Sequence, residues 1–354
     1  MRLTLTRASL RCQPNRRAAI SNSKRALGSF YTQGNPFVFK PFATWFAQLD
    51  KEQTLLEPFS GSGQIAELLS SAGYQSNFKF FDIDPTLQSS NSGAQYSSAP
   101  IEIHQQDTIA NFPTGFQATI TNPPYLSFHF AKRKGLNPTK EYFEGFDSLY
   151  QTAISKALAN CDFVAMIIPE SFVTSGLFTE RLQSVISLPF AMFSDTDMPT
   201  CLALWGPKNT DDFELWRGSE LLGDASELTA LPKATECKSR IVFNSIEGNV
   251  GLRAIDNSFE PSLAFCHPHE IPIEKVKNSA RLLTRISVAE ISEPNALIEI
   301  ANRNVSTWRE ATQDVCLTAF KGLRKDGRFR RRLDYANARA LLSQAICELE
   351  QHQH

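Results

Sequence analysis

The sequence predicts an α/β protein with a doubly wound, mostly parallel seven-stranded sheet, followed by a smaller C-terminal region. Between residues 27 and 208, short apolar runs alternate with stretches of helical periodicity, which is the pattern of strands joined by crossover helices. A glycine-rich turn follows the first strand, and an acidic residue stands at the end of each of the first three strands. After residue 208 the regular alternation fades.

The individual elements follow from length and periodicity. Short runs rich in β-branched, aromatic and other apolar residues predict strands, and longer runs with apolar residues at helical spacing predict helices. The predicted strands are residues 54–59, 78–84, 101–104, 117–121, 163–169, 190–193 and 201–205. The predicted helices are residues 35–49, 64–72, 141–160, 177–186 and, near the C-terminus, 335–351.

Charge divides the chain into three parts. Residues 1–26 form a basic arm with no acidic residue before Asp50, and we interpret the arm as flexible or DNA-touching. A transit peptide has a similar composition, so organellar targeting stays open beside a cytoplasmic location. Residues 27–208 form the main domain. Residues 209–354 form the smaller region, with a basic segment at 321–332 and a C-terminal helix.

The composition excludes several classes of protein. Hydrophobic residues make up 42% and charged residues 21%, as in a globular protein. No apolar run approaches the roughly 18 residues of a membrane-spanning helix, so no membrane partner is expected. The seven cysteines include no CxxC pair, which is typical of reduced thiols in a cytoplasmic protein. Residues 266–270 contain one cysteine, two histidines and a glutamate, but we interpret them as loop residues and expect no metal site.

The first strand runs into a glycine-rich turn suited to a nucleoside ligand. Gly61 and Gly63 allow a tight turn that a ligand can approach closely. Glu57 stands at the end of the strand, where its carboxylate can accept a hydrogen bond from a ligand ammonium. A phosphate-binding loop would end in Gly-Lys-Ser/Thr, which this turn does not.

The next two strands also end in acids. In the sequence FDIDP, Asp82 is placed to hold both hydroxyls of a ribose, and Ile83 to pack against an adenine ring. Asp84 is expected to stabilise the turn that follows. Asp107 closes the third strand and can accept a hydrogen bond from the adenine amino group. One such acid is often only strand-end solvation, but three in succession favour a ligand site.

The segment TITNPPYLSF predicts the reacting centre. Its two prolines, Pro123 and Pro124, fix two φ angles and make the turn rigid. The Asn122 side chain and the Pro123 carbonyl then become two acceptors with set directions. Such a pair can hold both hydrogens of an exocyclic amino group and localise its lone pair for attack on a sulfonium methyl. Tyr125 offers a flat face on which an extruded base can stack.

In order along the chain, LGSFYTQ, EPFSGSG, FDIDP, QQD and TNPPY resemble the γ arrangement of DNA amino-methyltransferases over residues 27–207. In that arrangement the target-recognition domain comes last, so the resemblance implies that residues 209–354 are a DNA target-recognition region. The resemblance implies a Rossmann-like class I methyltransferase fold, S-adenosylmethionine as cofactor and N6 of a flipped-out adenine as target. It further implies that Phe30, Tyr31 and Thr32 contact the methionine end of the cofactor. The other cofactor contacts it implies are Glu57, Pro58, Gly61, Gly63, Asp82, Ile83 and Asp107.

The same resemblance extends to the target base and the scaffold around it. Asn122, Pro123, Pro124 and Tyr125 would hold the base, with Phe193 either a second stacking aromatic or a core residue. Glu170, at the end of the strand over 163–169, is assigned to architecture rather than chemistry. The chain departs from the family pattern at residues 33–34, where Gln-Gly replaces a proline.

The basic segment is predicted to contact the phosphates of double-stranded DNA, because only Asp326 lies within it to neutralise its cations. The cations are Lys321, Arg324, Lys325, Arg328, Arg330, Arg331 and Arg332. A separate cognate restriction endonuclease is a possible partner. Methylation of adenine N6 in RNA, of cytosine N4 or of a glutamine amide stays open, as does a catalytically silent binding module.

Overall fold

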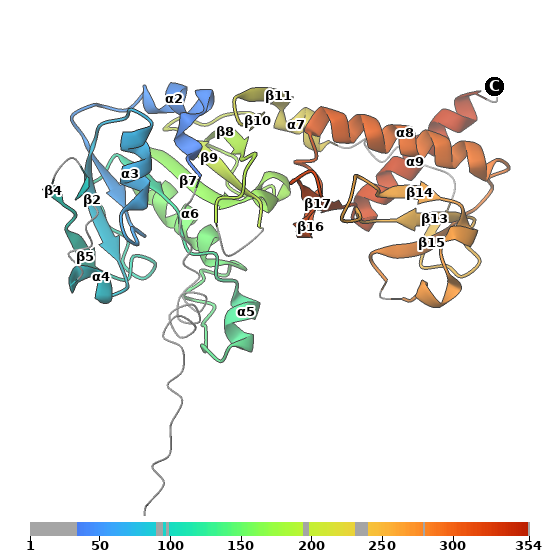
Figure 1. Cartoon of the computed structure of the whole chain (residues 1–354), viewed down its shortest axis with the longest axis horizontal. Coiled ribbons are helices and arrows are strands. Elements are labelled where there is room, and N and C mark those ends of the chain that lie inside the picture. The colour runs from blue at the N-terminus through green and yellow to red at the C-terminus, as the bar shows by residue number, and fades with distance from the viewer. Residues whose placement is uncertain are drawn as a thin grey trace, which may run out of the picture.

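The computed structural model describes residues 34–89, 95–96, 99–193, 198–230, 240–278 and 280–352. Its largest element is a nine-stranded sheet with the strand order β11-β10-β8-β9-β7-β6-β1-β2-β5 (Figure 1). The strands are β1 (Thr54–Glu57), β2 (Asn77–Asp82), β5 (Ile103–Gln105), β6 (Ala118–Thr121), β7 (Phe163–Pro169), β8 (Leu182–Ser187), β9 (Thr200–Trp205), β10 (Glu214–Arg217) and β11 (Glu220–Asp224).

The sheet confirms the predicted doubly wound, mostly parallel fold, but it has nine strands and not the predicted seven, because β8, β10 and β11 join it and residues 190–193 do not. β1, β2, β5, β6 and β7 pair in parallel, whereas β9 runs antiparallel to both β7 and β8. The chain moves outward from β1 to β2 and β5 on one side, and from β6 to β7 on the other. The connections therefore diverge between β1 and β6. In open α/β sheets, such a switch point at the carboxyl ends of the strands is where ligands bind.

Alternate residues of the central strands build two cores, because successive side chains of a strand point to opposite faces. Leu55 and Ile120 pack on one face with residues of α2 (Lys40–Phe46) and α3 (Gln64–Ser71). Leu56 and Met166 pack on the other face with α6 (Leu149–Asn160). The shorter elements around the sheet are η1 (Pro36–Val38), α4 (Thr86–Ser89), β3 (Gln95–Tyr96), β4 (Ala99–Pro100), α5 (Phe128–Arg133), η2 (Glu170–Thr174) and α7 (Ala225–Thr229).

Two predicted elements are wrong, one predicted helix is too long, and one domain boundary is corrected. The helix predicted over 141–160 begins only at Leu149, since residues 141–145 lie in turns. Residues 177–186 do not form a helix, since they end in strand β8, which is buried between β9 and β10. Residues 190–193 do not form a strand; they lie in a loop, where Met192 and Phe193 are buried. The hairpin β10–β11 continues the sheet, so this part of the chain extends past residue 208 to at least Asp224.

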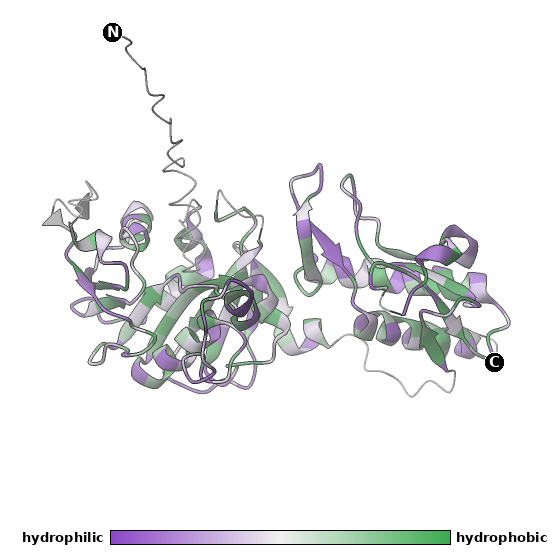
Figure 2. Cartoon of the chain, turned by 90° about the horizontal axis from the view of Figure 1, so that it is seen from below, coloured by the Kyte–Doolittle hydropathy of each residue, from purple (hydrophilic) through white to green (hydrophobic). Residues whose placement is uncertain are grey.

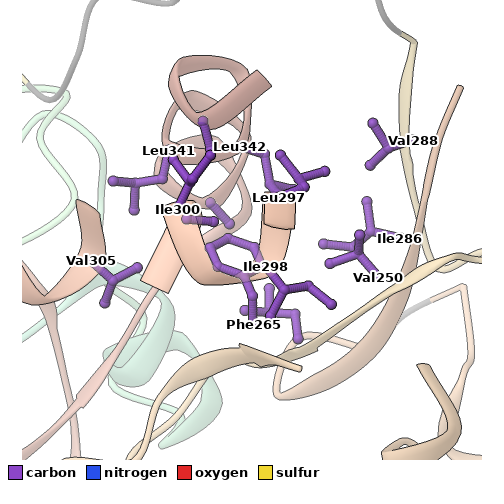
Figure 3. Close-up of a cluster of buried hydrophobic side chains, with 14 of the residues drawn as sticks. Val250, Phe265, Ile286, Val288, Leu297, Ile298, Ile300, Val305, Leu341 and Leu342 are labelled. Carbon is purple, nitrogen blue, oxygen red and sulfur yellow. The ribbon is translucent and has the colours of Figure 1, made fainter. Parts of the chain in front are cut away.

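The C-terminal region has a sheet of its own with the order β12-β15-β13-β14. Its antiparallel strands are β12 (Ile241–Phe243), β13 (Val250–Arg253), β14 (Ala264–Cys266) and β15 (Leu283–Val288), with short turns η3 (Pro268–Glu270) and η4 (Ile273–Lys275). Helices α8 (Pro294–Thr312) and α9 (Tyr335–His352) pack on this sheet, and their apolar faces meet its side chains in one core (Figure 3). Helix α9 was expected from the sequence, whereas α8 was not.

A hairpin of β16 (Thr318–Leu323) and β17 (Phe329–Arg332) lies between the two parts of the molecule (Figure 1). Figure 2 shows it as a largely hydrophilic arm. Just before it, Val315 and Cys316 are buried in the α6-side core of the large sheet. The Trp308 indole N–H of α8 donates to the Leu228 carbonyl at 3.2 Å, so the two parts are in direct contact. None of the helices in the described part of the chain is both long and apolar enough to cross a bilayer.

Candidate active site

Polar side chains line the carboxyl edge of the large sheet. Because the central strands are parallel, their ends meet at this edge. Across the sheet, Asp107 follows β5, Asp82 ends β2, Glu57 ends β1 and Asn122 follows β6. The structure therefore brings the four predicted strand-end residues to one edge, with Glu57 and Asn122 on either side of the switch point.

The glycine turn after β1 has the backbone conformation that glycine allows. Gly61 has φ +53° and Gly63 has φ +85°, both in the left-handed region that disfavours residues with a side chain. A Cβ on Gly63 would also lie 2.5 Å from the Ile101 side chain, whereas one on Gly61 would meet no atom within 4 Å. The turn is tied to the next strand, because the Ser60 N–H donates to the Phe81 carbonyl at 2.9 Å.

Glu57 is a buried carboxylate at the end of β1. Its side chain is 0% exposed, and neither carboxylate oxygen has a hydrogen-bond partner among the described residues. Burial, with a further contribution from the nearby Asp82 carboxylate, raises the pKa of Glu57 well above its ordinary value. A buried carboxylate without a donor is costly to keep ionised. The ammonium group of an amino-acid moiety would satisfy it, which is the fit expected for S-adenosylmethionine.

Asp82 is held in place while keeping acceptor capacity. Its Oδ2 accepts from the Gly61 N–H at 2.8 Å, and its Oδ1 accepts from the Asp84 N–H at 2.9 Å. A carboxylate has about four acceptor positions, so both oxygens can still take a ligand hydroxyl. Burial raises the pKa of Asp82 despite these hydrogen bonds. Ile83 beside it is 46% exposed, which suits a residue that covers an aromatic ring.

The structure adds Tyr142 to the site, a residue that belongs to no motif in the sequence. Its hydroxyl lies 3.1 Å from each carboxylate oxygen of Asp107. Asp107 Oδ1 also accepts from the backbone N–H groups of Ile109 and Ala110, both at 3.1 Å. Burial and the Asp107 carboxylate raise the pKa of Tyr142, so its hydroxyl stays protonated and donates. The third acid of the edge is therefore oriented before any ligand arrives.

The Asn-Pro-Pro-Tyr turn is braced by its own tyrosine. Pro123 is buried, and the Tyr125 hydroxyl lies 2.7 Å from both Asn122 Oδ1 and the Ile167 carbonyl. The Tyr125 ring meets the rings of Tyr150 and Phe193 edge to face, with centroids 6.3 Å and 6.0 Å away. The turn is thereby tied to β7, the neighbouring strand, and the Asn122 side chain is held by a side-chain partner of its own motif.

Several predicted site residues either lie away from this sheet edge or are not among the residues that the structure describes. Phe193 is 3% exposed and packs in the core against the edge of Tyr125, so a place in a base stack stays a prediction. Phe30, Tyr31 and Thr32 lie outside the described residues, as does the basic arm over 1–26. Within the described residues, no cluster of three or more histidine, cysteine, aspartate or glutamate side chains could hold a metal.

The sequence predicted that the cations of the basic segment, with only Asp326 among them, are left free, but acids from elsewhere in the chain neutralise two of them. Arg324 is buried and pairs with Asp256 at 3.1 Å, with Asp314 at 3.5 Å and with Asp326 at 3.0 Å. Buried Arg331 pairs with Glu170 at 2.5 Å. We therefore remove these two arginines from the predicted DNA contacts. Of the rest, Lys321, Lys325 and Arg328 are exposed, and Arg330 and Arg332 are half-buried.

Glu170 extends the polar edge and joins the two parts of the molecule. It follows β7, next to the strand that carries Asn122, and is 3% exposed. Its Oε1 accepts from the Ser187 hydroxyl at 2.6 Å, and its Oε2 accepts from Arg331 of β17. Glu170 is thus architectural, as expected from the sequence, but what it fixes is the β16–β17 hairpin beside the candidate active site.

Comparison with known proteins finds similarities of low identity. No protein-family model matches the chain. Over 256 residues it is 23% identical to the type II methyltransferase M.AccI of Acinetobacter calcoaceticus, a match that covers 65% of this chain and 47% of the relative. The chain thus matches about half the length of this curated relative.

Solved structures with low similarity include three methyltransferases. A modification subunit of a putative type I restriction enzyme from Vibrio vulnificus is 14% identical, with 57% of this chain and 50% of that chain covered at TM-score 0.37. A putative class I S-adenosylmethionine-dependent methyltransferase from Listeria monocytogenes is 14% identical, with 52% and 65% covered at TM-score 0.39. A type I restriction-modification methyltransferase subunit from Streptococcus thermophilus is 16% identical, with 52% and 46% covered at TM-score 0.38.

Proposed function

We propose that this protein is a DNA methyltransferase that transfers a methyl group from S-adenosylmethionine to N6 of an adenine flipped out of double-stranded DNA. One observation carries the proposal. Glu57, which is buried and has no hydrogen-bond partner among the described residues, ends β1 on one side of the switch point, and the Asn-Pro-Pro-Tyr turn follows β6 on the other side. A cofactor ammonium and a target amino group would therefore bind at adjacent strand ends.

The cofactor side of the site uses the residues already described. Glu57 would accept from the ammonium, Asp82 would hold the ribose hydroxyls, and Asp107 would accept from the adenine amino group. The rigid Gly61–Gly63 turn would let the cofactor lie against the backbone. When bound, S-adenosylmethionine supplies an electrophilic methyl group on a sulfonium. The work of the protein is to orient that methyl toward the end of β6.

The target side of the site activates a poor nucleophile. Asn122 Oδ1 and the Pro123 carbonyl would accept the two hydrogens of the adenine amino group, which localises the nitrogen lone pair. The two acceptors would thus orient the nitrogen toward the methyl group that the cofactor would supply; the thioether would be the leaving group, and the nitrogen would give up one proton to solvent. The Tyr125 hydroxyl, 2.7 Å from Asn122 Oδ1, holds that side chain in place, and the ring supports the extruded base.

The way in which the C-terminal region is attached to the large sheet supports DNA as the substrate. Arg331 on β17 binds Glu170 at the same sheet edge, so the hairpin is fixed next to the candidate active site. The hairpin also carries the exposed cations Lys321, Lys325 and Arg328, which suit phosphate contacts. Residues 240–352 would then be the target-recognition region. The basic arm over 1–26 would make further DNA contacts, and a separate restriction endonuclease is a proposed protein partner.

The proposed function is tested with labelled S-adenosylmethionine and unmethylated genomic DNA. The DNA is digested to nucleosides after incubation with the full chain, and methylated nucleosides are identified by mass spectrometry. We expect N6-methyladenine in DNA. N4-methylcytosine in DNA, label only in RNA supplied in parallel, or label only in protein would each contradict the proposal and assign the corresponding alternative activity.

Cofactor binding should depend on pH through Glu57. Because burial raises the pKa of this carboxyl, the free protein holds a proton there over a range of pH in which a free glutamate is ionised. An ammonium partner needs the carboxylate, so binding should release a proton, and affinity should rise with pH until the raised pKa is passed. Calorimetry of S-adenosylmethionine binding in buffers of different ionisation enthalpy measures the number of protons released on binding.

The matched control for this experiment is Glu57→Gln, which keeps the shape of the side chain and cannot ionise. We expect weaker cofactor binding and no proton release in this variant. The range from roughly pH 5 to pH 8 lies above the ordinary pKa of glutamate. If the wild-type protein binds the cofactor with the same affinity throughout this range, the assignment of Glu57 to the ammonium is wrong.

A further inference from the structure

Two neighbouring loops form a rigid tip beside the β16–β17 hairpin. One is the loop over 256–262, between β13 and β14, and the other is the hairpin turn over 324–328. They are joined by a backbone hydrogen bond from the Lys325 N–H to the Ser258 carbonyl at 2.9 Å. Within the first loop, the Asn257 side chain accepts from the Phe259 N–H at 2.7 Å and from the Glu260 N–H at 2.9 Å.

A single buried carboxylate organises both loops. Asp256 is 0% exposed and accepts from donors in the first loop, in α8 and in the hairpin. Its donors are the Ser262 N–H at 2.8 Å, the Leu263 N–H at 3.1 Å, Arg309 at 2.9 and 3.0 Å, Arg324 at 3.1 Å and the Arg331 N–H at 3.1 Å. Burial alone would raise the pKa of Asp256, but its hydrogen bonds with Arg309 hold it below the ordinary value.

The tip presents an aromatic ring that has no place in any core. Phe259 is 61% exposed, and the Lys325 ammonium lies 4.5 Å from the ring centroid. Exposed Arg328 follows in the same turn, whereas the nearby Asp326 carboxylate is already bound by Arg324. Glu260 is the other exposed acid of the tip. The exposed Phe259 ring therefore lies close to the cations Lys325 and Arg328. This combination favours a partner that has both flat apolar surfaces and phosphates.

We propose that Phe259 is an apolar wedge set against the base stack of bound DNA, with Lys325 and Arg328 on the flanking phosphates. The inference rests on the proposed function, since it concerns the same DNA. Proteins that deform DNA commonly press an apolar side chain between base steps. The hairpin turn of the tip leads directly into β17, the strand that contains Arg331. Lys325 is six residues from Arg331, so the two residues are at most about 20 Å apart along an extended chain. The wedge would therefore act near the base that is extruded toward Tyr125.

The experiment compares binding of the full-length variants to unmethylated duplex DNA by fluorescence anisotropy over a range of salt concentrations. Phe259→Ser should weaken binding by about tenfold or more, because it removes the apolar contact with the bases, and should leave the salt slope unchanged. Phe259→Leu keeps the apolar bulk and should retain most of the affinity. Lys325→Ala with Arg328→Ala should instead lower the slope of log affinity against log salt by about 0.9 for each lost phosphate contact.

Controls separate this proposal from the proposed function. Ile246→Ala removes a comparable apolar side chain that is 52% exposed in the same region, and it should leave DNA affinity unchanged. If wild-type protein binds and methylates DNA but Phe259→Ser binds it equally well, the wedge is wrong and the function stands. Absence of any wild-type DNA binding overturns both. Loss of self-association in Phe259→Ser at unchanged DNA affinity would assign the ring to a second copy of the chain, which also overturns the wedge.

Discussion

Replacing Asn122 with alanine should reduce the rate of methyl transfer by about a hundredfold or more while cofactor affinity and folding are retained. The magnitude is typical of removing one preorganised hydrogen-bonding group from a reacting centre. Asn122 follows β6 at the sheet edge and is only half-buried, so its loss should not disturb the core. Single-turnover kinetics with saturating S-adenosylmethionine measure the chemical step, and thermal unfolding checks the fold.

Two matched variants resolve the roles within the turn. Asn122→Asp keeps an acceptor oxygen at the same place and should lose less activity than Asn122→Ala. Tyr125→Phe keeps the aromatic ring but removes the hydroxyl that lies 2.7 Å from Asn122 Oδ1, so its activity should fall between the wild type and Asn122→Ala. If the rate of Asn122→Ala stays within about tenfold of the wild-type rate, equivalent to about 1.4 kcal/mol, the hydrogen bond from the adenine amino group to Asn122 does not activate the nitrogen.

The sequence predicted the central strands and the residues at their ends because that information is local. A buried strand such as β7 is a continuous apolar run, and its predicted and observed bounds coincide at Phe163–Pro169. Once parallel strands are assumed, their carboxyl ends must share an edge, so Glu57, Asp82 and Asn122 could be placed together without coordinates. The chemical roles of these residues stay predictions.

Elements defined by distant partners could not be predicted in this way. Strand β8 has the mixed sequence LQSVIS and is a strand because β9 and β10 pair with it on either side. Likewise, Arg331 looked like one more cation of a basic run, although its partner Glu170 is 161 residues away in the chain. Periodicity and local charge contain no signal for such a pair. Only the fold decides which cations of a basic segment are already neutralised.

The Glu170–Arg331 pair should therefore contribute strongly to stability. Both side chains are 3% exposed, so replacing Arg331 with methionine leaves a buried carboxylate whose remaining described donor is the Ser187 hydroxyl. We expect the free energy of unfolding to fall by about 3–5 kcal/mol, as for other buried pairs that lose one partner. The double variant Glu170→Gln with Arg331→Met removes both charges and should recover most of that loss. Denaturant unfolding of the two single variants and the double variant completes a thermodynamic cycle.

Arg303→Met is the control for this cycle. Arg303 also pairs with a glutamate, Glu348, but its side chain is 60% exposed, so the loss should be about 1 kcal/mol or less. High salt should weaken the exposed pair and leave the buried one nearly unchanged, because solvent ions screen only charges that they can reach. Equal losses in Arg331→Met and Arg303→Met would show that the buried pair does not fix the hairpin to the sheet. The double variant would then be no more stable than Arg331→Met alone, and the attachment would depend on the apolar contacts of Val315 and Cys316 instead.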